Sequence, residues 1–270
     1  MKKNTLAKSQ VIAVSGGKGG IGKTFFSVNF AVELASFGNK VLIFDADINL
    51  SNVHLLLHID ENKNFKDFID GQIKIEDVIQ KGVGGVDVLY VGDELNHIYH
   101  LKEDEISRIY SDLVNLESYY DYIIVDTQAG LNELNVSLLS LADRIILITN
   151  PEITAIVDLY KTIKVVSLKA PGIQFEIVVN KCVSAQSGMD VFQKIENTVS
   201  QFRVRSKLFL LGFILADHER VLESIQKRVP IVLLHKNGNV KGCFKLVIDA
   251  FLKKEKKRKK ISFLQNLLKH

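Results

Sequence analysis

The stretch that most constrains the fold of this chain is SGGKGGIGKT, from Ser15 to Thr24. It follows a short apolar run, 11–15, and it opens a segment with the apolar spacing of a helix, 23–37. A glycine-rich loop between a strand and a helix lets backbone N–H groups and the helix N-terminus face a bound phosphate. We therefore expect a nucleotide site at the carboxyl end of a parallel sheet.

The loop matches two nucleotide fingerprints at once. The spacing Gly17-x-Gly19-x-x-Gly22 is typical of dinucleotide binding, and GGKGGIGKT over the same residues matches the nucleoside-triphosphate P-loop. Asp45 ends the next apolar run, where an acid could bind a ribose and thus favour a dinucleotide. A glycine-rich loop by itself can also be only a tight turn, so the nucleotide has to be identified from other residues.

Three features favour the triphosphate. Lys23 can neutralise β- and γ-phosphates, and the hydroxyl of Thr24 can bind Mg²⁺, whereas a dinucleotide site needs neither. The second predicted strand ends in two acids, Asp45 and Asp47. The apolar run YIIVD delivers a further acid, Asp126, as expected of a strand that holds Mg²⁺ beside a P-loop. The sequence therefore predicts binding of ATP together with Mg²⁺.

The rest of the chain alternates apolar runs with helical segments. The runs are continuous rather than alternating in polarity, which indicates strands covered on both faces. The predicted strands are 11–15, 40–45, 86–91, 122–126, 144–149, 175–180 and 207–215. The predicted helices are 23–37, 102–116, 132–141, 154–168, 188–201, 218–226 and 241–254, with one or two short helices in 64–80 and a loop or short helix in 46–60. This pattern predicts an α/β fold, a doubly wound and mainly parallel sheet with helices on both faces, formed by residues 1–252 as one domain.

Charge is distributed unevenly along the chain. The 35 Lys and Arg outnumber the 31 Asp and Glu, but residues 253–270 alone hold eight Lys or Arg and one Glu. The remaining chain therefore carries a net charge of about −3, which argues against a broad nucleic-acid-binding surface. The two cysteines, Cys182 and Cys243, lack the paired spacing of an iron–sulfur or zinc site and are typical of a reducing compartment. The residues before the first strand are too few for a signal peptide, so we expect a cytoplasmic protein.

The C-terminal segment 253–270 combines a basic run, KKEKKRKK, with the apolar-patterned ISFLQNLLKH. One interpretation is a basic end whose short helix packs on the body of the protein. The other is an amphipathic tail that lies on an anionic membrane surface. The residues expected to contact the membrane are Lys256, Lys257, Arg258, Ile261, Phe263, Leu264, Leu267 and Leu268.

Lys18 is a second lysine inside the loop, where neither fingerprint asks for one. A P-loop needs one lysine to neutralise the phosphates. Lys18 is therefore either a solvated surface lysine or a finger that crosses a dimer interface to stabilise charge on the partner's nucleotide. The physics of the sequence leaves these two interpretations open.

The motifs resemble one family. GGKGGIGKT resembles the deviant Walker A loop of the MinD/ParA ATPases, in which the first lysine acts in trans. DADINLSNVHLLL and DTQAG resemble switch I and switch II of that family, and VVNK resembles its adenine-reading strand end. GFILADHERVLESIQKRVPI resembles the strand, loop and helix that close over the base. The segments TNPEITAIVDLYKTIK and 63–80 are most similar to the FlhG branch, also called YlxH or FleN, which regulates flagellar number.

The resemblance, which spans residues 11–252 and continues into the tail, implies a role for each matching residue. Lys18 and Lys23 contact phosphates, Lys18 in trans, and Asp47 orients the attacking water or accepts its proton. The implied nucleotide-binding residues are Gly17, Lys18, Gly19, Gly20, Ile21, Gly22, Lys23, Thr24, Asn180, which reads adenine, and Lys181; those around Mg²⁺ are Thr24, Asp45 and Asp126. The chain departs from the family pattern at Gln128, where relatives usually have Pro or Gly.

The resemblance also implies partners. It predicts a slow, Mg²⁺-dependent ATPase that forms a homodimer when ATP is bound and attaches reversibly to the inner face of the cytoplasmic membrane. The flagellar GTPase FlhF and proteins of the flagellar C-ring are the implied protein partners, and no specific nucleic acid is expected. The alternatives are a MinD-like division-site regulator, a ParA-like DNA partition ATPase and an iron–sulfur carrier of the same superfamily.

Overall fold

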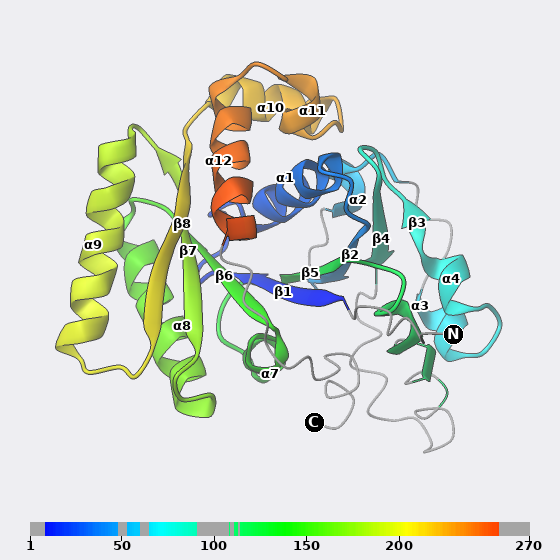
Figure 1. Ribbon diagram of the computed structural model, residues 1–270, viewed down its shortest axis with the longest axis horizontal. Coiled ribbons are helices and arrows are strands. Elements are labelled where there is room, and N and C mark those ends of the chain that lie inside the picture. Colours follow the sequence, from blue (N-terminus) through cyan, green and yellow to red (C-terminus); the bar gives the residue numbers. More distant parts are fainter. Residues whose placement is uncertain are drawn as a thin grey trace, which may run out of the picture.

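The computed structural model describes residues 9–47, 53–59, 65–90, 108, 111, 112 and 114–253. Strands and helices alternate over much of the described chain, with successive helices within 53–78 and within 218–253 (Figure 1). The strands are β1 (Gln10–Ser15), β2 (Val41–Ala46), β3 (Gln80–Lys81), β4 (Val86–Tyr90), β5 (Tyr122–Thr127), β6 (Arg144–Thr149), β7 (Gln174–Cys182) and β8 (Lys207–Leu215). The helices are α1 (Lys23–Ser36), α2 (Val53–Leu56), α3 (Phe65–Ile69), α4 (Ile75–Val78), α7 (Glu133–Leu141), α8 (Ile153–Lys169), α9 (Ala185–Gln201), α10 (His218–Gln226), α11 (Ile231–Leu234) and α12 (Asn239–Lys253).

The strands form one sheet in the order β3-β4-β2-β5-β1-β6-β7-β8. Every pairing is parallel except the short antiparallel contact of β3 with β4 at the edge. Strand β1, which enters the P-loop, lies between β5 and β6 in the middle of the sheet. Asp45 of β2 is directly opposite Asp126 of β5, so the register brings two of the predicted acids together at the carboxyl edge.

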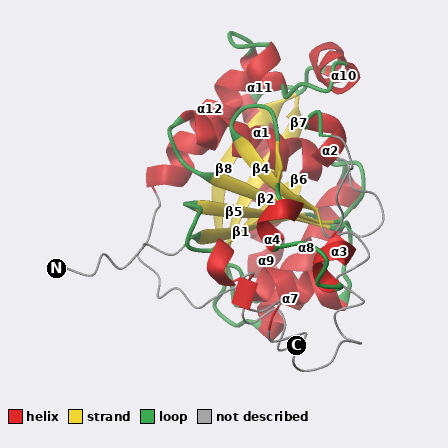
Figure 2. Ribbon diagram, turned by 90° about the vertical axis from the view of Figure 1, so that its right-hand side faces the viewer, coloured by secondary structure: helices red, strands yellow, loops and turns green. Residues whose placement is uncertain are grey.

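Helices cover both faces of the sheet, as Figure 2 shows. Alternate residues of β1 enter cores on different faces of the sheet. Ile12 and Val14 belong to the core that is covered by α1, α2, α11 and α12. Val11 belongs to the core of α3, α4 and α7, and Ala13 to the core of α8 and α9. Burial of each large apolar side chain contributes about 1.5–3 kcal/mol. Double-sided burial explains why the strands have continuous apolar sequences.

The predicted fold class, a doubly wound and mainly parallel α/β sheet, is confirmed. Two short elements were not predicted, β3 and α11, because segments of two and four residues carry too little periodicity to detect. Helix α9 begins three residues before the predicted start, because Ser184 caps it by accepting a hydrogen bond from the Ser187 N–H at 3.1 Å. Most of the predicted helix 102–116 lies outside the described residues.

No helix among the described residues is both long and apolar enough to span a bilayer. Of the predicted tail, 253–270, only Lys253 is described, as the last residue of α12, and every residue expected to contact a membrane lies outside the described residues. The two cysteines are free and buried, and they lie in different cores on opposite faces of the sheet.

Candidate functional site

The P-loop joins β1 to α1, and its glycines are needed for close packing. Gly22 has a φ of 93° and stands at the N-cap of α1. A Cβ at Gly22 would overlap the side-chain amide of Asn180, and a Cβ at Gly17 would overlap the backbone of α8 at Asp158. Glycine is therefore required at both positions, at Gly22 also for its left-handed backbone.

The inner end of the loop buries the charged group of Lys23, whose residue is 7% exposed. Burial lowers the pKa of Lys23, while the charges of Asp126 and Asp47 oppose that shift. The ammonium group therefore lies in a low-dielectric region and interacts with the two acids predicted for the site. Such a cation interacts more strongly with a phosphate than a solvated one does.

Asp126 is the last residue but one of β5 and lies in the interior, beside the start of α1. Its Oδ1 accepts a hydrogen bond from the Ser27 hydroxyl at 2.7 Å, but its buried Oδ2 has no hydrogen-bond partner in the described part of the chain. Burial raises the pKa of Asp126 to about 6, and the hydroxyls of Ser27 and Thr24 and the charge of Lys23 oppose this shift. The ionised carboxylate is thus poorly solvated, so a cation or its water ligand would stabilise it.

These residues fit a Mg²⁺ ion. The carboxylate oxygen of Asp126 without a partner, the Thr24 hydroxyl and the buried Asp45 carboxylate offer hard oxygen ligands near the phosphate loop. The described residues contain no group of three His, Cys, Asp or Glu that could hold a metal by themselves. The remaining ligands would therefore be phosphate oxygens and water, the usual way in which Mg²⁺ binds in nucleotide sites.

Asp47 follows β2 and is near this group. Its backbone N–H donates a hydrogen bond to Oδ1 of Asp45 at 3.1 Å. Its charge acts on both Lys23 and Asp126, which places its carboxylate within electrostatic range of the predicted phosphate and metal positions. The segment 48–52 that follows it lies outside the described residues.

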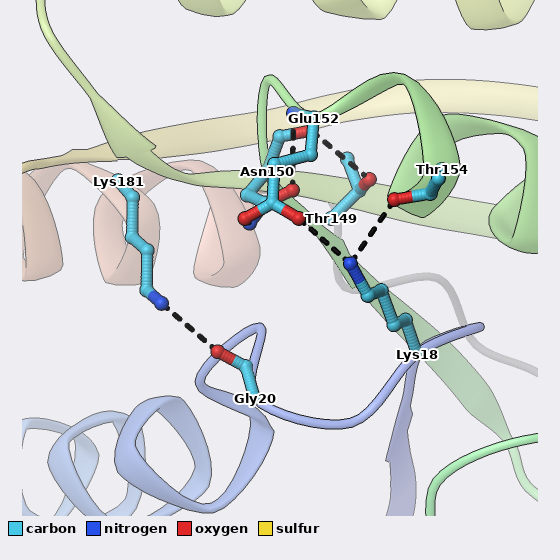
Figure 3. A network of polar contacts seen from close by, with 7 residues as sticks. All are labelled: Lys18, Gly20, Thr149, Asn150, Glu152, Thr154 and Lys181. Carbon is cyan, nitrogen blue, oxygen red and sulfur yellow. Dashed lines mark hydrogen bonds and ion pairs between the residues drawn. The ribbon is translucent and has the colours of Figure 1, made fainter.

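The outer end of the loop carries Lys18, whose side chain points toward Glu152 and Thr154 (Figure 3). Its Nζ contacts Oε2 of Glu152 at 2.8 Å and donates a hydrogen bond to the Thr154 hydroxyl at 3.0 Å. Glu152 is the N-cap residue of α8, and its Oε1 accepts a second hydrogen bond, from the side-chain amide of Asn150, at 2.8 Å. The hydrogen bond from Lys18 is the main reason why the pKa of Glu152 is lowered. Lys18 is therefore held by its own chain at the surface.

Asn180 and Lys181, at the end of β7, contact the backbone of the P-loop. The amide of Asn180 donates to the carbonyl of Ile21 at 2.8 Å, and its carbonyl accepts from the Lys181 N–H at 2.9 Å. The ammonium of Lys181 donates to the carbonyl of Gly20 at 2.9 Å (Figure 3). In this structure Asn180 is thus engaged by the protein, so adenine reading by its amide, which the resemblance implied, stays a prediction.

A cavity of about 350 Å³ lies beside the loop, at the carboxyl ends of β7 and β8. This volume is within the usual range of small-molecule sites. Its lining is mostly apolar, with Phe25, Ile214, Leu215, Val221 and Ile225 beside Asn180 and Lys181. It can therefore hold a flat apolar group such as a nucleotide base next to the phosphate loop. Motif matching found the segment that closes this cavity but not the individual apolar residues, because they belong to no fixed motif.

Gln128, the departure from the family pattern, is tied to the start of α7. Its Oε1 accepts a hydrogen bond from the side chain of Asn132 at 2.7 Å, and its backbone carbonyl accepts one from Asn135 at 2.8 Å. Asn135 also donates to the carbonyl of Gly130 at 2.9 Å. The segment after Asp126 is therefore held by hydrogen bonds from Asn132, the N-cap of α7, and from Asn135 in α7.

Comparisons with known proteins agree with this geometry. A family model described as an AAA domain matches residues 9–175. The chain is 32% identical to the antiactivator FleN of Pseudomonas aeruginosa, over 88% of this chain and 84% of that protein. It is 29% identical to the flagellum site-determining protein YlxH of Helicobacter pylori, over 76% and 69% of the two chains.

Among solved structures, the septum site-determining protein MinD complexed with Mg-ADP, from Pyrococcus horikoshii, superposes with a TM-score of 0.68. It is 25% identical, and the match covers 92% of this chain and 96% of that one. The chain thus shares its fold with a protein that binds Mg-ADP. Together with the P-loop geometry, these matches show that the chain belongs to the MinD/ParA family of ATP-binding P-loop ATPases and is FlhG-like.

Proposed function

We propose that this protein is an ATP-dependent dimerising switch that hydrolyses ATP slowly, attaches to the membrane through its tail, and regulates the number or placement of flagella. The observation that carries the proposal is that two lysines of one loop lie in different environments. Lys23 is buried beside Asp126, whereas Lys18 is bound at the surface by Glu152 and Thr154. A surface lysine next to a phosphate loop is available to a second copy of the chain.

The chemistry requires positioning and charge stabilisation rather than covalent catalysis. Lys23 binds the β- and γ-phosphates within its own subunit, and Asp47 orients the attacking water. Mg²⁺, when bound by Thr24, Asp45 and Asp126, supplies positive charge at the phosphates. Lys18 of each subunit stabilises the charge that develops on the partner's triphosphate, as an arginine finger does in other phosphoryl-transfer enzymes.

Dimerisation then depends on ATP. The contact of Lys18 with Glu152 lies within one subunit, so Lys18 has to leave Glu152 before it can reach across an interface. A bound triphosphate attracts the lysine of the partner, and hydrolysis removes part of this attraction. ATP binding therefore favours the dimer, and hydrolysis releases it.

Replacement of the trans lysine tests the proposal. We expect Lys18→Ala to abolish ATP-dependent dimerisation, measured by light scattering, while the monomer keeps its affinity for ADP within about threefold, because the contact is made only across the interface. The matched control is Lys161→Ala, which removes an exposed lysine that pairs with Asp158 on its own helix. A wild-type ATPase rate per molecule that does not change with protein concentration would contradict the model.

We assign residues 1–252 to the ATPase domain and 253–270 to a membrane-binding tail. Basic residues contribute about 1 kcal/mol each at an anionic surface, and inserted apolar side chains add to this, while ordering of the tail opposes binding. One tail then binds weakly, and two tails on a dimer bind more tightly through their effective concentration. Membrane attachment would thereby report the ATP-bound state.

The tail is tested with vesicles that contain phosphatidylglycerol. We expect the full chain to co-sediment with them in the presence of ATP and much less in the presence of ADP, whereas a chain that lacks 253–270 still binds ATP but stays in the supernatant. Vesicles of phosphatidylcholine alone are the control for the charge requirement. Equal sedimentation with ADP and ATP would refute the switch but leave membrane binding itself in place.

The flagellar role rests on the relatives. FleN is named an antiactivator and YlxH a flagellum site-determining protein, and both align with more than two thirds of this chain. We infer that the partners of this switch belong to the flagellar system, with the flagellar GTPase FlhF and C-ring proteins as the candidates. The protein would act in the cytoplasm and reversibly at the membrane.

A further inference from the structure

Arg228 follows α10 in an unusual backbone conformation. Its φ is 53°, in the left-handed region where glycine is the ordinary residue. Two hydrogen bonds close the helix end, from the Arg228 N–H to the carbonyl of Ile225 and from the Val229 N–H to the carbonyl of Ser224, both at 3.1 Å. This is the Schellman arrangement, whose left-handed position most often carries glycine. An arginine at this position costs backbone strain, which a stabilising contact of its side chain would offset.

That side chain reaches a distant segment of the chain. The Nε of Arg228 donates to the carbonyl of Leu55 at 3.2 Å, and one of its terminal nitrogens donates to the carbonyl of Ile59 at 3.1 Å. The Leu55 carbonyl is in the last turn of α2, where a helix leaves its carbonyls without partners of its own, and the Ile59 carbonyl lies three residues beyond the last helical residue, Leu56. The fixed fork of a guanidinium suits two carbonyls at once. Arg228 thus caps α2 from more than 160 residues away.

The two helices joined by Arg228 face different parts of the site. Helix α10 contributes Val221 and Ile225 to the wall of the apolar cavity beside the P-loop. Helix α2 begins at Val53, six residues after Asp47, within the segment that resembles switch I. The five residues between Asp47 and α2 lie outside the described part of the chain, so the described contacts of Arg228 end at α2 itself.

We propose that Arg228 is a positioning residue that transmits occupancy of the base cavity to α2. The inference rests on the proposed function, since it requires a nucleotide whose base fills the cavity. A base packed on Val221 and Ile225 holds α10 in place, α10 holds Arg228, and the guanidinium holds the end of α2. The phosphates and the base would then act on the protein through separate contacts, and only the base would act on α2.

The test compares two ligands that share phosphates and differ in the base. ADP fills both the P-loop and the cavity, whereas inorganic pyrophosphate fills only the P-loop. The reporters are the amides of Leu57 and Ile59, which donate within the end of α2 to the carbonyls of Val53 and His54, both at 3.0 Å. In the wild-type chain we expect saturating ADP to slow hydrogen exchange of the 53–59 peptide about fivefold or more relative to saturating pyrophosphate.

Arg228→Gly removes the guanidinium and suits the left-handed backbone, so the fold should keep its melting temperature or gain slightly. In this variant ADP and pyrophosphate should protect the 53–59 peptide equally. Arg220→Ala is the matched control, because Arg220 pairs with Asp217 beside the same helix and has no bond to α2 among its described contacts; it should behave as the wild type does.

Two outcomes overturn the inference. Preferential protection by ADP that persists in Arg228→Gly would show that the base signals by another route. Equal protection by both ligands in a wild-type chain that binds ADP would show that the base does not signal to α2. Calorimetric titration of ADP separates these results from a failure of the proposed function, because a wild-type chain that does not bind ADP would refute both.

Discussion

The two ends of the P-loop place the same side chain in opposite environments. At the inner end Lys23 is 7% exposed, and burial lowers its pKa. At the outer end the side chain of Lys18 is 40% exposed and bound to Glu152 and Thr154. They are five positions apart in sequence, but one lysine lies beside the buried Asp126 while the other lies at the N-terminus of α8.

This difference separates two tasks that a phosphate loop can perform. A buried cation without bulk solvent stabilises phosphate charge strongly and cannot leave its position. An exposed ion pair contributes little to folding and exchanges partners readily. The inner end is therefore suited to binding within the subunit and the outer end to a contact that forms and breaks, which is what a dimerising switch requires.

Loss of the inner lysine should have the largest effect. Lys23→Met keeps the buried volume nearly unchanged but removes the charge beside the phosphates. We expect ADP affinity to fall about 10- to 100-fold, since a hydrogen bond to a charged group contributes about 1.5–3 kcal/mol. Isothermal titration calorimetry measures the affinity.

Circular dichroism gives the control for Lys23→Met, and its spectrum should match that of the wild type. Lys18→Ala provides the comparison, because the outer lysine should change monomer affinity little. If the two variants lost similar affinity for ADP, the proposed separation between the ends of the loop would be wrong.

The fold could be predicted from sequence because its strands are buried on both faces. Runs such as 122–126 and 144–149 are continuous and apolar, and the structure places strands there. The glycine loop also indicates where the nucleotide site lies, since a P-loop needs a strand before it and a helix after it. The order of the strands in the sheet was not predicted. Short elements such as β3 and α11 could not be predicted, because their positions depend on tertiary contacts rather than on local pattern.

Residues with fixed spacing, Lys23, Thr24 and Asp126, could be placed near one another from the sequence, and the structure brings them together. The partner of Lys18 could not, because Glu152 is 134 residues away and an exposed ion pair has no sequence signal. The contact of Asn180 with the carbonyl of Ile21 was missed for a similar reason, since backbone acceptors are invisible to motif matching. The stated roles of these residues remain predictions.

Loss of the outer acid should have the smaller effect. Glu152→Gln keeps the shape of the side chain and its contact with Asn150 but removes the charge that holds Lys18. A freed Lys18 reaches a partner subunit more easily, so we expect the fraction of dimer at limiting ATP to rise about two- to fivefold, a modest change because exposed ion pairs are weak. Analytical ultracentrifugation across a series of ATP concentrations measures this shift.

Asp158→Asn is the control for Glu152→Gln, because it removes an acid of the same helix that pairs with Lys161 instead. Raised salt should weaken the ion pair of Lys18 with Glu152 in the wild type, as Glu152→Gln does, because screening weakens exposed charges first. A dimer fraction that falls in Glu152→Gln would mean that Glu152 supports the interface, receiving Lys18 from the partner rather than restraining its own. The comparison between the two ends of the loop would then hold for burial, but the outer contact would belong to the dimer and not to the resting subunit.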